Sequence, residues 1–130
     1  MIKIDQGVDI VEISKFSEVV KRNGQFLLDL FTERERSHCQ SMKDPIPHFA
    51  GRFAAKESCA KALGHGFSGL GIDHLFQEIE VVPTPSGKPE IALSGWAAKI
   101  AKRRKIAQTS VSISHTSGYA MASVILVGMG

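Results

Sequence analysis

The sequence predicts an α+β fold in which an antiparallel sheet packs against helices. Three observations support this class: an alternating apolar run at the N-terminus (Ile2, Ile4), helical periodicity in the segments after it, and two strand–turn–strand patterns in the second half. The order strand, three helices, hairpin, helix, hairpin is typical of such a domain. We expect residues 1–130 to form one domain, because the sequence contains no linker, repeat or low-complexity tract.

Different signals predict the first two helices. Apolar residues recur at helical spacing after the first strand, and these are Ile13, Phe16, Val19 and Val20. Gly24 is a plausible end of this first helix. Thr32 and Glu35 have the spacing of a capping box, in which hydroxyl and carboxylate each bind a free backbone amide, so a short second helix is expected there. Pro45 and Pro47 are expected to end it.

The third helix, residues 50–64, carries an acid and a base one turn apart. Glu57 and Lys61 are separated by four residues and therefore share a face. Ala50 and Ala54 continue this face, which would leave room for a ligand to lie against the helix backbone. The alternative for the two charges is a solvated ion pair worth roughly 0.3–0.5 kcal/mol. A further face is apolar and would anchor the helix; it consists of Phe49, Phe53, Ala60 and Leu63.

Glycines follow this helix closely. Gly64 suits the left-handed backbone conformation that ends many helices. The residues after it predict a flexible loop, and they include Gly66, Ser68, Gly69 and Gly71. Such a loop could approach a phosphate with its backbone or move as a lid, and a plain connection is the alternative.

The second half of the chain predicts two hairpins with a helix between them. Their strands are rich in apolar residues and lie around residues 78–81, 91–93, 111–113 and 121–127. Residues 83–87 and 116–118 supply the turns. Ser94 can cap the intervening helix, whose Trp96 and Ile100 are expected to face inward.

Composition and charge favour a small intracellular protein. The chain has 16 Lys and Arg residues against 13 Asp and Glu, and residues 102–105 are all basic. Cys39 and Cys59 are expected to be reduced thiols, because nothing resembles a disulfide framework or a Cys-x-x-Cys metal site. The N-terminus lacks the apolar core of a signal peptide, and no apolar run approaches membrane-spanning length. We expect a cytoplasmic protein without a membrane partner.

Three segments together resemble a known family. Gly-Val-Asp occupies residues 7–9, Phe-Ala-Gly-Arg-Phe-Ala-Ala-Lys-Glu-Ser-Cys-Ala-Lys-Ala-Leu-Gly runs from Phe49 to Gly64, and Ser-Ile-Ser-His at 112–115 precedes Tyr-Ala-Met-Ala at 119–122. In this order and spacing they are similar to phosphopantetheinyl transferases of the holo-acyl-carrier-protein synthase type. The resemblance implies transfer of the 4′-phosphopantetheine group of coenzyme A to a serine of apo-acyl carrier protein. Adenosine 3′,5′-bisphosphate would be released, and the reaction would serve fatty acid biosynthesis.

The resemblance also implies the residues of the active site. Asp9 and Glu57 would hold Mg²⁺ or Mn²⁺ against the pyrophosphate of coenzyme A, and Lys61 would neutralise phosphate oxygens. Asp9 is expected where the first strand turns into the first helix. Glu57, or a water polarised by the metal, is the candidate base for the attacking serine. The residues expected to bind the coenzyme are Arg52, Lys61, Gly64, Ser114 and His115.

Some of these residues are expected to serve a neighbouring subunit. Arg52 lies about 140° around the helix from Glu57, at roughly 100° per residue, so both cannot serve one site from one face. The resemblance implies a homotrimer with active sites between subunits, in which Arg52, Ser114 and His115 reach a neighbour's nucleotide. A short domain is also expected to need a partner subunit to cover its apolar surface.

The first helix is the expected docking surface for the acidic, helical carrier protein. Lys15, Val19 and Arg22 lie at positions i, i+4 and i+7 and so form one stripe. The family usually has arginine at the first of these positions. Lys15 keeps the charge but lacks the planar fork that binds a carboxylate in two places, so affinity or partner choice could differ.

Two other functions compete with the transferase. One is a basic nucleic-acid-binding domain that uses residues 102–105; the mild overall charge and the absence of an aromatic-rich platform argue against it, and no nucleic-acid partner is expected. The other is a non-catalytic trimeric interaction protein. The complete set of Asp9, Glu57 and Lys61 argues against this second alternative.

Overall fold

The computed structural model describes residues 1–64 and 72–130. Its elements, in chain order, are β1 (Ile2–Glu12), α1 (Ile13–Arg22), α2 (Gln25–Leu30), α3 (Glu33–Gln40), α4 (Pro45–Ala62), α5 (Ile72–Glu78), β2 (Ile79–Pro83), β3 (Pro89–Leu93), α6 (Gly95–Arg103), β4 (Ile106–His115) and β5 (Tyr119–Met129). An antiparallel sheet has the order β1-β5-β4, and β2 and β3 form a separate antiparallel hairpin. The predicted α+β class with antiparallel pairing is confirmed.

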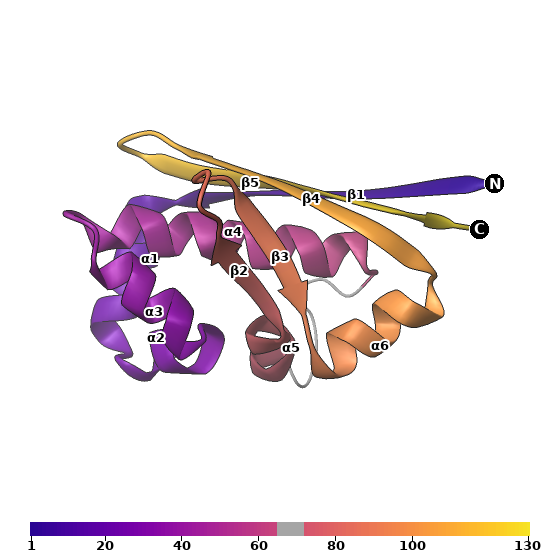
Figure 1. The fold of residues 1–130 in the computed structure, drawn as a ribbon. Helices are drawn as coiled ribbons and strands as arrows, with labels where there is room; N and C mark the ends of the chain where they lie inside the picture. The colour runs from indigo at the N-terminus through magenta and orange to yellow at the C-terminus, as the bar shows by residue number, and fades with distance from the viewer. Residues whose placement is uncertain (65–71) are drawn as a thin grey trace.

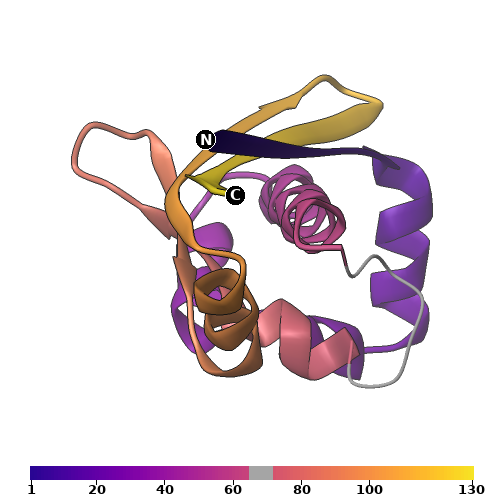
Figure 2. The ribbon, with the colours of Figure 1, turned by 90° about the vertical axis from the view of Figure 1, so that its right-hand side faces the viewer.

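Helix α4 lies at the centre of the molecule. The long strands β1, β5 and β4 run along one side of it (Figure 1), and it packs mainly against β1 and β5. In the end-on view, α1 flanks α4 on one side and the β2–β3 hairpin and α6 lie on the other, with α5 opposite the sheet (Figure 2). Most residues of α4 are therefore buried, including its charged Arg52, Lys56 and Glu57. No described helix combines the length and apolarity that crossing a membrane requires.

Strand β1 touches the backbone of α4 at Gly7. A Cβ atom built on Gly7 would lie 1.8 Å from the Ser58 carbonyl oxygen, so no side chain fits there. The Ser58 hydroxyl donates to the carbonyl oxygens of Ala54 at 2.7 Å and Ala122 at 3.0 Å, which ties α4 to β5. Ala50 and Ala54 are fully buried. The expectation that these alanines leave room for a ligand is wrong, because elements of the same chain pack over them.

An ion pair is buried between α3 and α4. The side chains of Lys56 and Glu35 have no exposed surface, and their Nζ and Oε1 atoms lie 2.7 Å apart. Lys56 also donates to the carbonyl oxygens of Phe76 at 2.6 Å and Ile79 at 2.7 Å, and Glu35 accepts from the Val81 amide at 2.8 Å. Burial lowers the pKa of Lys56, and the Glu35 carboxylate opposes that shift. The pair thus joins α3 and α4 to the junction of α5 and β2.

Both cysteines are buried and neither forms a disulfide. Burial raises the pKa of Cys39 to about 11 and that of Cys59 to about 12. Their thiols therefore stay protonated near neutral pH, and we assign them to the core rather than to chemistry.

Several local predictions are confirmed. The side chain of Thr32 and that of Glu35 form the predicted capping box at the start of α3. Gly64 has the left-handed conformation expected after α4, with φ +89°. Both hairpins form where the strand and turn signals place them. The glycine-rich segment 66–71 lies outside the described residues.

Other predictions at the element ends are wrong. Strand β1 continues to Glu12, so Asp9 lies inside the strand opposite Ala122 and not at a strand–helix junction. The pairing with β5 persists along the whole strand, which is why β1 is longer than its local sequence indicates. Pro45 begins α4 instead of ending the preceding helix, because the first turn of a helix does not need the amide that proline lacks. Helices α2 and α5 were not predicted.

Trp96 does not face inward as expected. Its side chain is 54% exposed, whereas Ile100 is 5% exposed. The buried stripe of α6 consists of Ala97, Ile100 and Ala101. Trp96 stands in the first turn beside this stripe and lies under the Arg103 guanidinium, which is 5.9 Å from the ring centroid.

Candidate active site

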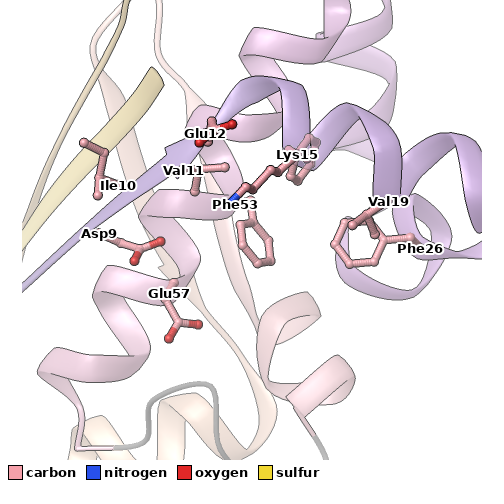
Figure 3. A pocket seen from close by; sticks show the side chains of 10 residues that line it. Asp9, Ile10, Val11, Glu12, Lys15, Val19, Phe26, Phe53 and Glu57 are labelled. Atoms are coloured by element: carbon pink, nitrogen blue, oxygen red, sulfur yellow. The ribbon is translucent and has the colours of Figure 1, made fainter. Parts of the chain in front are cut away.

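Two carboxylates from distant segments meet beside the close contact of β1 with α4. Side chains alternate along a strand, so Asp9 points to the same side as Gly7, toward α4. Glu57 precedes Ser58, the residue that Gly7 touches. Asp9 and Glu57 both line a pocket of about 560 Å³, and Figure 3 shows the Asp9 side chain extending from β1 toward the part of α4 that carries Glu57. The two named residues of the Gly-x-Asp motif are therefore linked in the structure. Gly7 permits β1 to lie close to α4, and this close packing places Asp9 beside Glu57.

Lys61 completes this acidic pair. Its Nζ atom lies 3.1 Å from Oδ1 of Asp9 and 3.2 Å from the Val8 carbonyl oxygen. The ion pair crosses from α4 to β1, and the side chains of Lys61 and Asp9 are 44% and 18% exposed. Because water screens an exposed pair, its contribution to stability is at most about 1 kcal/mol. Lys61 is not among the residues that line the pocket, and its ammonium is partly exposed beside Asp9.

The two carboxylates suit a hard cation. Within residues 1–64 and 72–130, no group of three or more His, Cys, Asp or Glu side chains could hold a metal ion. A structural zinc site, which needs four such ligands, is therefore not formed by the described part of the chain. Mg²⁺ differs, since it accepts one or two protein carboxylates and leaves its other positions to water and substrate phosphates. Asp9 and Glu57 fit that requirement.

The remaining wall of this pocket comes from α1, α2 and α4. Lys15 and Val19, two of the predicted docking residues, line it together with an aromatic cluster. The rings of that cluster lie 5.6 to 5.9 Å apart and belong to Phe16, Phe26 and Phe53. The Lys15 side chain extends from α1 toward the carboxylates (Figure 3). Arg22 is exposed in the last turn of α1, farther along the helix.

Arg52 and His115 line a second pocket, of about 410 Å³, which we call the Arg52 pocket. Its walls come from α3, α4, β4 and the turn between β2 and β3; the lining residues are His38, Met42, His48, Arg52, Pro83, Thr84, Gly87, Pro89, Ile113 and His115. Arg52 is 8% exposed, and among the described residues its buried Nε atom has no hydrogen-bond partner. Arg52 and Glu57 thus serve different pockets, as their angular offset on α4 requires.

Ser114 and Gly64 are not among the residues that line either of these two pockets. Ser114 is exposed on β4 opposite Met121 of β5, and strand alternation points it away from the side that His115 occupies. Gly64 follows the end of α4, where Arg104 donates to the Ala62 carbonyl oxygen at 2.9 Å. Arg104 also binds Asp5 at 2.6 Å. This part of the basic run is committed to holding the end of α4, which weakens the nucleic-acid alternative.

Sequence reasoning missed two histidines of the Arg52 pocket. His48 lies one turn before Arg52 on α4, and its ring centroid is 5.4 Å from that of His115. His38 comes from α3. The spacing of four residues between His48 and Arg52 was the available signal, because it places both on one helix face. His38 had no such signal, since its place depends on how α3 packs against α4.

Comparison with known proteins identifies related sequences and structures. A family model described as the 4′-phosphopantetheinyl transferase superfamily matches residues 6–124. The holo-[acyl-carrier-protein] synthases of Caldanaerobacter subterraneus subsp. tengcongensis and Syntrophotalea carbinolica are each 43% identical to this chain, over 94% of it and over 93% and 94% of their own lengths.

Solved structures of similar proteins include complexes with coenzyme A. The ACPS–CoA complex of Chronobacterium ammoniagenes matches with a TM-score of 0.84 and 33% identity, covering 98% of this chain and 99% of the other. The holo-[acyl-carrier-protein] synthase of Helicobacter pylori in complex with coenzyme A matches with a TM-score of 0.78 and 34% identity, covering 93% and 98%.

Proposed function

Since this chain belongs to the 4′-phosphopantetheinyl transferase superfamily, and to its holo-[acyl-carrier-protein] synthases, we propose that it transfers the 4′-phosphopantetheine group of coenzyme A to a serine of apo-acyl carrier protein. Adenosine 3′,5′-bisphosphate is the second product, and the holo-carrier serves fatty acid biosynthesis. The observation that carries the proposal is the convergence of Asp9 from β1 and Glu57 from α4 beside Lys61. Coenzyme A complexes of similar proteins support the choice of donor.

The reaction replaces the anhydride oxygen on one phosphorus of coenzyme A by the ester oxygen of the serine. The serine oxygen forms a bond to the phosphorus that carries the pantetheine arm, and the bond from that phosphorus to the bridging oxygen breaks. The electron pair leaves with adenosine 3′,5′-bisphosphate, so negative charge grows on the bridging oxygen. Lys61 supplies a cation that reaches this charge from α4. The serine proton goes to Glu57 or to a water in the pocket.

Asp9 and Glu57 are the residues that would hold Mg²⁺, or Mn²⁺ in its place. The bound ion would supply positive charge to the pyrophosphate oxygens. Lys61 keeps Asp9 in position through its 3.1 Å contact, and the packing of Gly7 on Ser58 keeps β1 and α4 at a constant separation. The pair is thus organised by the fold before a ligand arrives.

We further propose a homotrimer with active sites between its subunits. The outer face of the β1-β5-β4 sheet supports this, because it exposes large apolar side chains that a partner would cover. These are Ile2, Ile4, Val8, Ile10, Tyr119, Met121 and Met129. Ser114 lies on this face, and Arg52 and His115 line a different pocket from the one that Asp9 and Glu57 line. In the proposed trimer Arg52 and His115 bind the nucleotide end of a neighbour's coenzyme, and Ser114 contacts that coenzyme from the outer face of the sheet. Gly64 leaves room for the coenzyme beside Lys61.

The carrier protein is proposed to dock on α1. Lys15 and Val19 line the pocket that holds the carboxylates, so a partner on this helix would present its serine near Glu57. Arg22 extends the basic edge farther along α1. Acidic helices of the partner would be attracted to these charges.

Mass spectrometry of an apo-acyl carrier protein tests the function. Incubation with this protein, coenzyme A and Mg²⁺ should add one phosphopantetheine group to the carrier, and omission of coenzyme A or addition of a chelator should prevent the gain. A carrier whose target serine is replaced by alanine is the matched control. No mass gain on any of several apo-carriers at saturating coenzyme A and Mg²⁺ would refute the proposal.

A further inference from the structure

We propose that His48 and His38 are anion-binding side chains of the Arg52 pocket, so that a phosphate monoester bound there is taken up together with a proton. This inference rests on the proposed function, which places the nucleotide end of coenzyme A at Arg52 and His115. It adds two residues to that site and makes the affinity for the nucleotide dependent on pH.

Arg52 supplies a permanent positive charge to this pocket. Its guanidinium is drawn into the wall between α3, α4 and β4, with 8% of the residue exposed. In the described part of the chain its buried Nε atom has no hydrogen-bond partner. A guanidinium offers donors in a planar fork that matches phosphate oxygens. A buried arginine with an unused donor, at a pocket of about 410 Å³, is therefore suited to an anionic ligand larger than a single phosphate.

Three imidazole rings line the same pocket as this guanidinium. His48 and His115 contact each other at 5.4 Å between ring centroids, with the ring planes at 70°. His38 lines the same pocket from α3. No aspartate or glutamate is among the described residues that line it. The side chains of this lining that can change charge near neutral pH are therefore histidines, and a histidine becomes positively charged when it takes up a proton.

The neighbouring charges determine how these rings titrate. Burial lowers the pKa of His48, and the nearby His115 and Arg52 lower it further, while Asp44 at the start of α4 raises it. Burial also lowers the pKa of His38, with added contributions from Arg52 and His48. Both rings are consequently neutral near pH 7 in the free protein. A phosphate dianion would reverse the sign of the local field and favour both imidazolium forms.

The consequence is coupling between proton uptake and nucleotide binding. A group that is neutral in the free protein and protonated in the complex makes binding tighter as the pH falls. Coenzyme A and adenosine 3′,5′-bisphosphate both carry the 3′-phosphate monoester. Mild acid should therefore strengthen the binding of donor and product alike.

Isothermal titration calorimetry with adenosine 3′,5′-bisphosphate tests this coupling. Measurements in two buffers of different ionisation enthalpy give the number of protons taken up, for the wild type and for a His38→Gln/His48→Gln double variant. Near pH 6.5 we expect the wild type to take up about half a proton more per site than the double variant. Between about pH 8 and pH 6 the affinity of the wild type for the nucleotide should rise about tenfold more than the affinity of the double variant does. Protonation of the ligand itself is common to both proteins and cancels in the difference.

His74→Gln is the matched control, because His74 is exposed on α5 and does not line the Arg52 pocket. This variant should behave as the wild type. The single variant His48→Gln should lose part of the pH-dependent difference, so the test survives if the double variant does not fold. Equal proton uptake by the wild type and by the variants lacking His48 would overturn the inference.

The transferase assay at about pH 8, where both rings are neutral, separates this inference from the proposed function. Phosphopantetheine transfer with no histidine-dependent proton uptake would overturn the inference alone. Absence of both transfer and nucleotide binding would overturn the proposed function together with it.

Discussion

Replacement of Gly7 by alanine should damage both the stability and the activity of this protein. A Cβ atom at residue 7 would lie 1.8 Å from the Ser58 carbonyl oxygen and 3.1 Å from the Ala62 amide nitrogen. Ordinary contacts begin at 3.4 Å. The first partner is helix backbone, which cannot rotate away as a flexible side chain would, so β1 and α4 would have to separate by roughly 1.5 Å.

The expected loss of stability follows from this displacement. Overpacking a well-packed site costs typically about 1–3 kcal/mol, and a clash between two backbones belongs at or above the upper end of that range. The same movement would carry Asp9, two residues along β1, away from Glu57. Misplacement of reacting groups by about 1 Å can cost roughly a hundredfold in rate, so we expect a loss of that size in phosphopantetheine transfer.

Urea unfolding at one protein concentration measures the first effect, and carrier mass gain measures the second. Gly24→Ala is the matched control, because a Cβ atom at residue 24 would meet nothing within 4 Å. It should change neither quantity appreciably. A Gly7→Ala protein with wild-type unfolding and wild-type transfer would refute the argument that close approach of β1 to α4 positions the acidic pair.

Three further predictions concern the site and its assembly. Glu57→Gln and Asp9→Asn should each reduce transfer at least about a hundredfold, because stabilisation of transition-state charge by a metal ion is worth several kcal/mol. Circular dichroism should show that the fold is retained. Near wild-type turnover at saturating Mg²⁺ would contradict the metal assignment. Lys15→Glu should raise KM for carrier protein about tenfold at low salt and less at high salt, and it should raise KM for coenzyme A by a smaller factor. Equal effects on both substrates would point to a damaged helix. Finally, mixed oligomers of Glu57→Gln with an Arg52→Ala/His115→Ala variant should regain activity that neither parent has, because some interfaces combine only wild-type groups; no recovery in verified mixed trimers would place the site within one chain.

Features that depend on a few neighbouring residues could be predicted from the sequence. The capping box of Thr32 and Glu35 satisfies amides within one helical turn, and Gly64 ends α4 through its own backbone freedom. The hairpins follow from alternation and turn residues. The motif around Glu57 and Lys61, together with Gly-x-Asp, was sufficient to indicate the family, because it preserves the order and spacing of chemically constrained residues.

Features that depend on distant partners required the tertiary structure. Strand β1 extends past Asp9 because it pairs with β5 from Ile2–Met129 to Glu12–Tyr119, at the other end of the chain. Lys56 resembles any helical surface lysine until α3 and the α5–β2 junction bring Glu35 and two carbonyl oxygens to it. The Arg52 pocket likewise needs α3, α4 and β4 in place at once. The sequence shows the residue types and their spacing, whereas the packing of the whole chain decides which side chains are buried and which are paired. The physical reason is that the pKa of a charged group and the energetic cost of burying it depend on the neighbours that replace water around it.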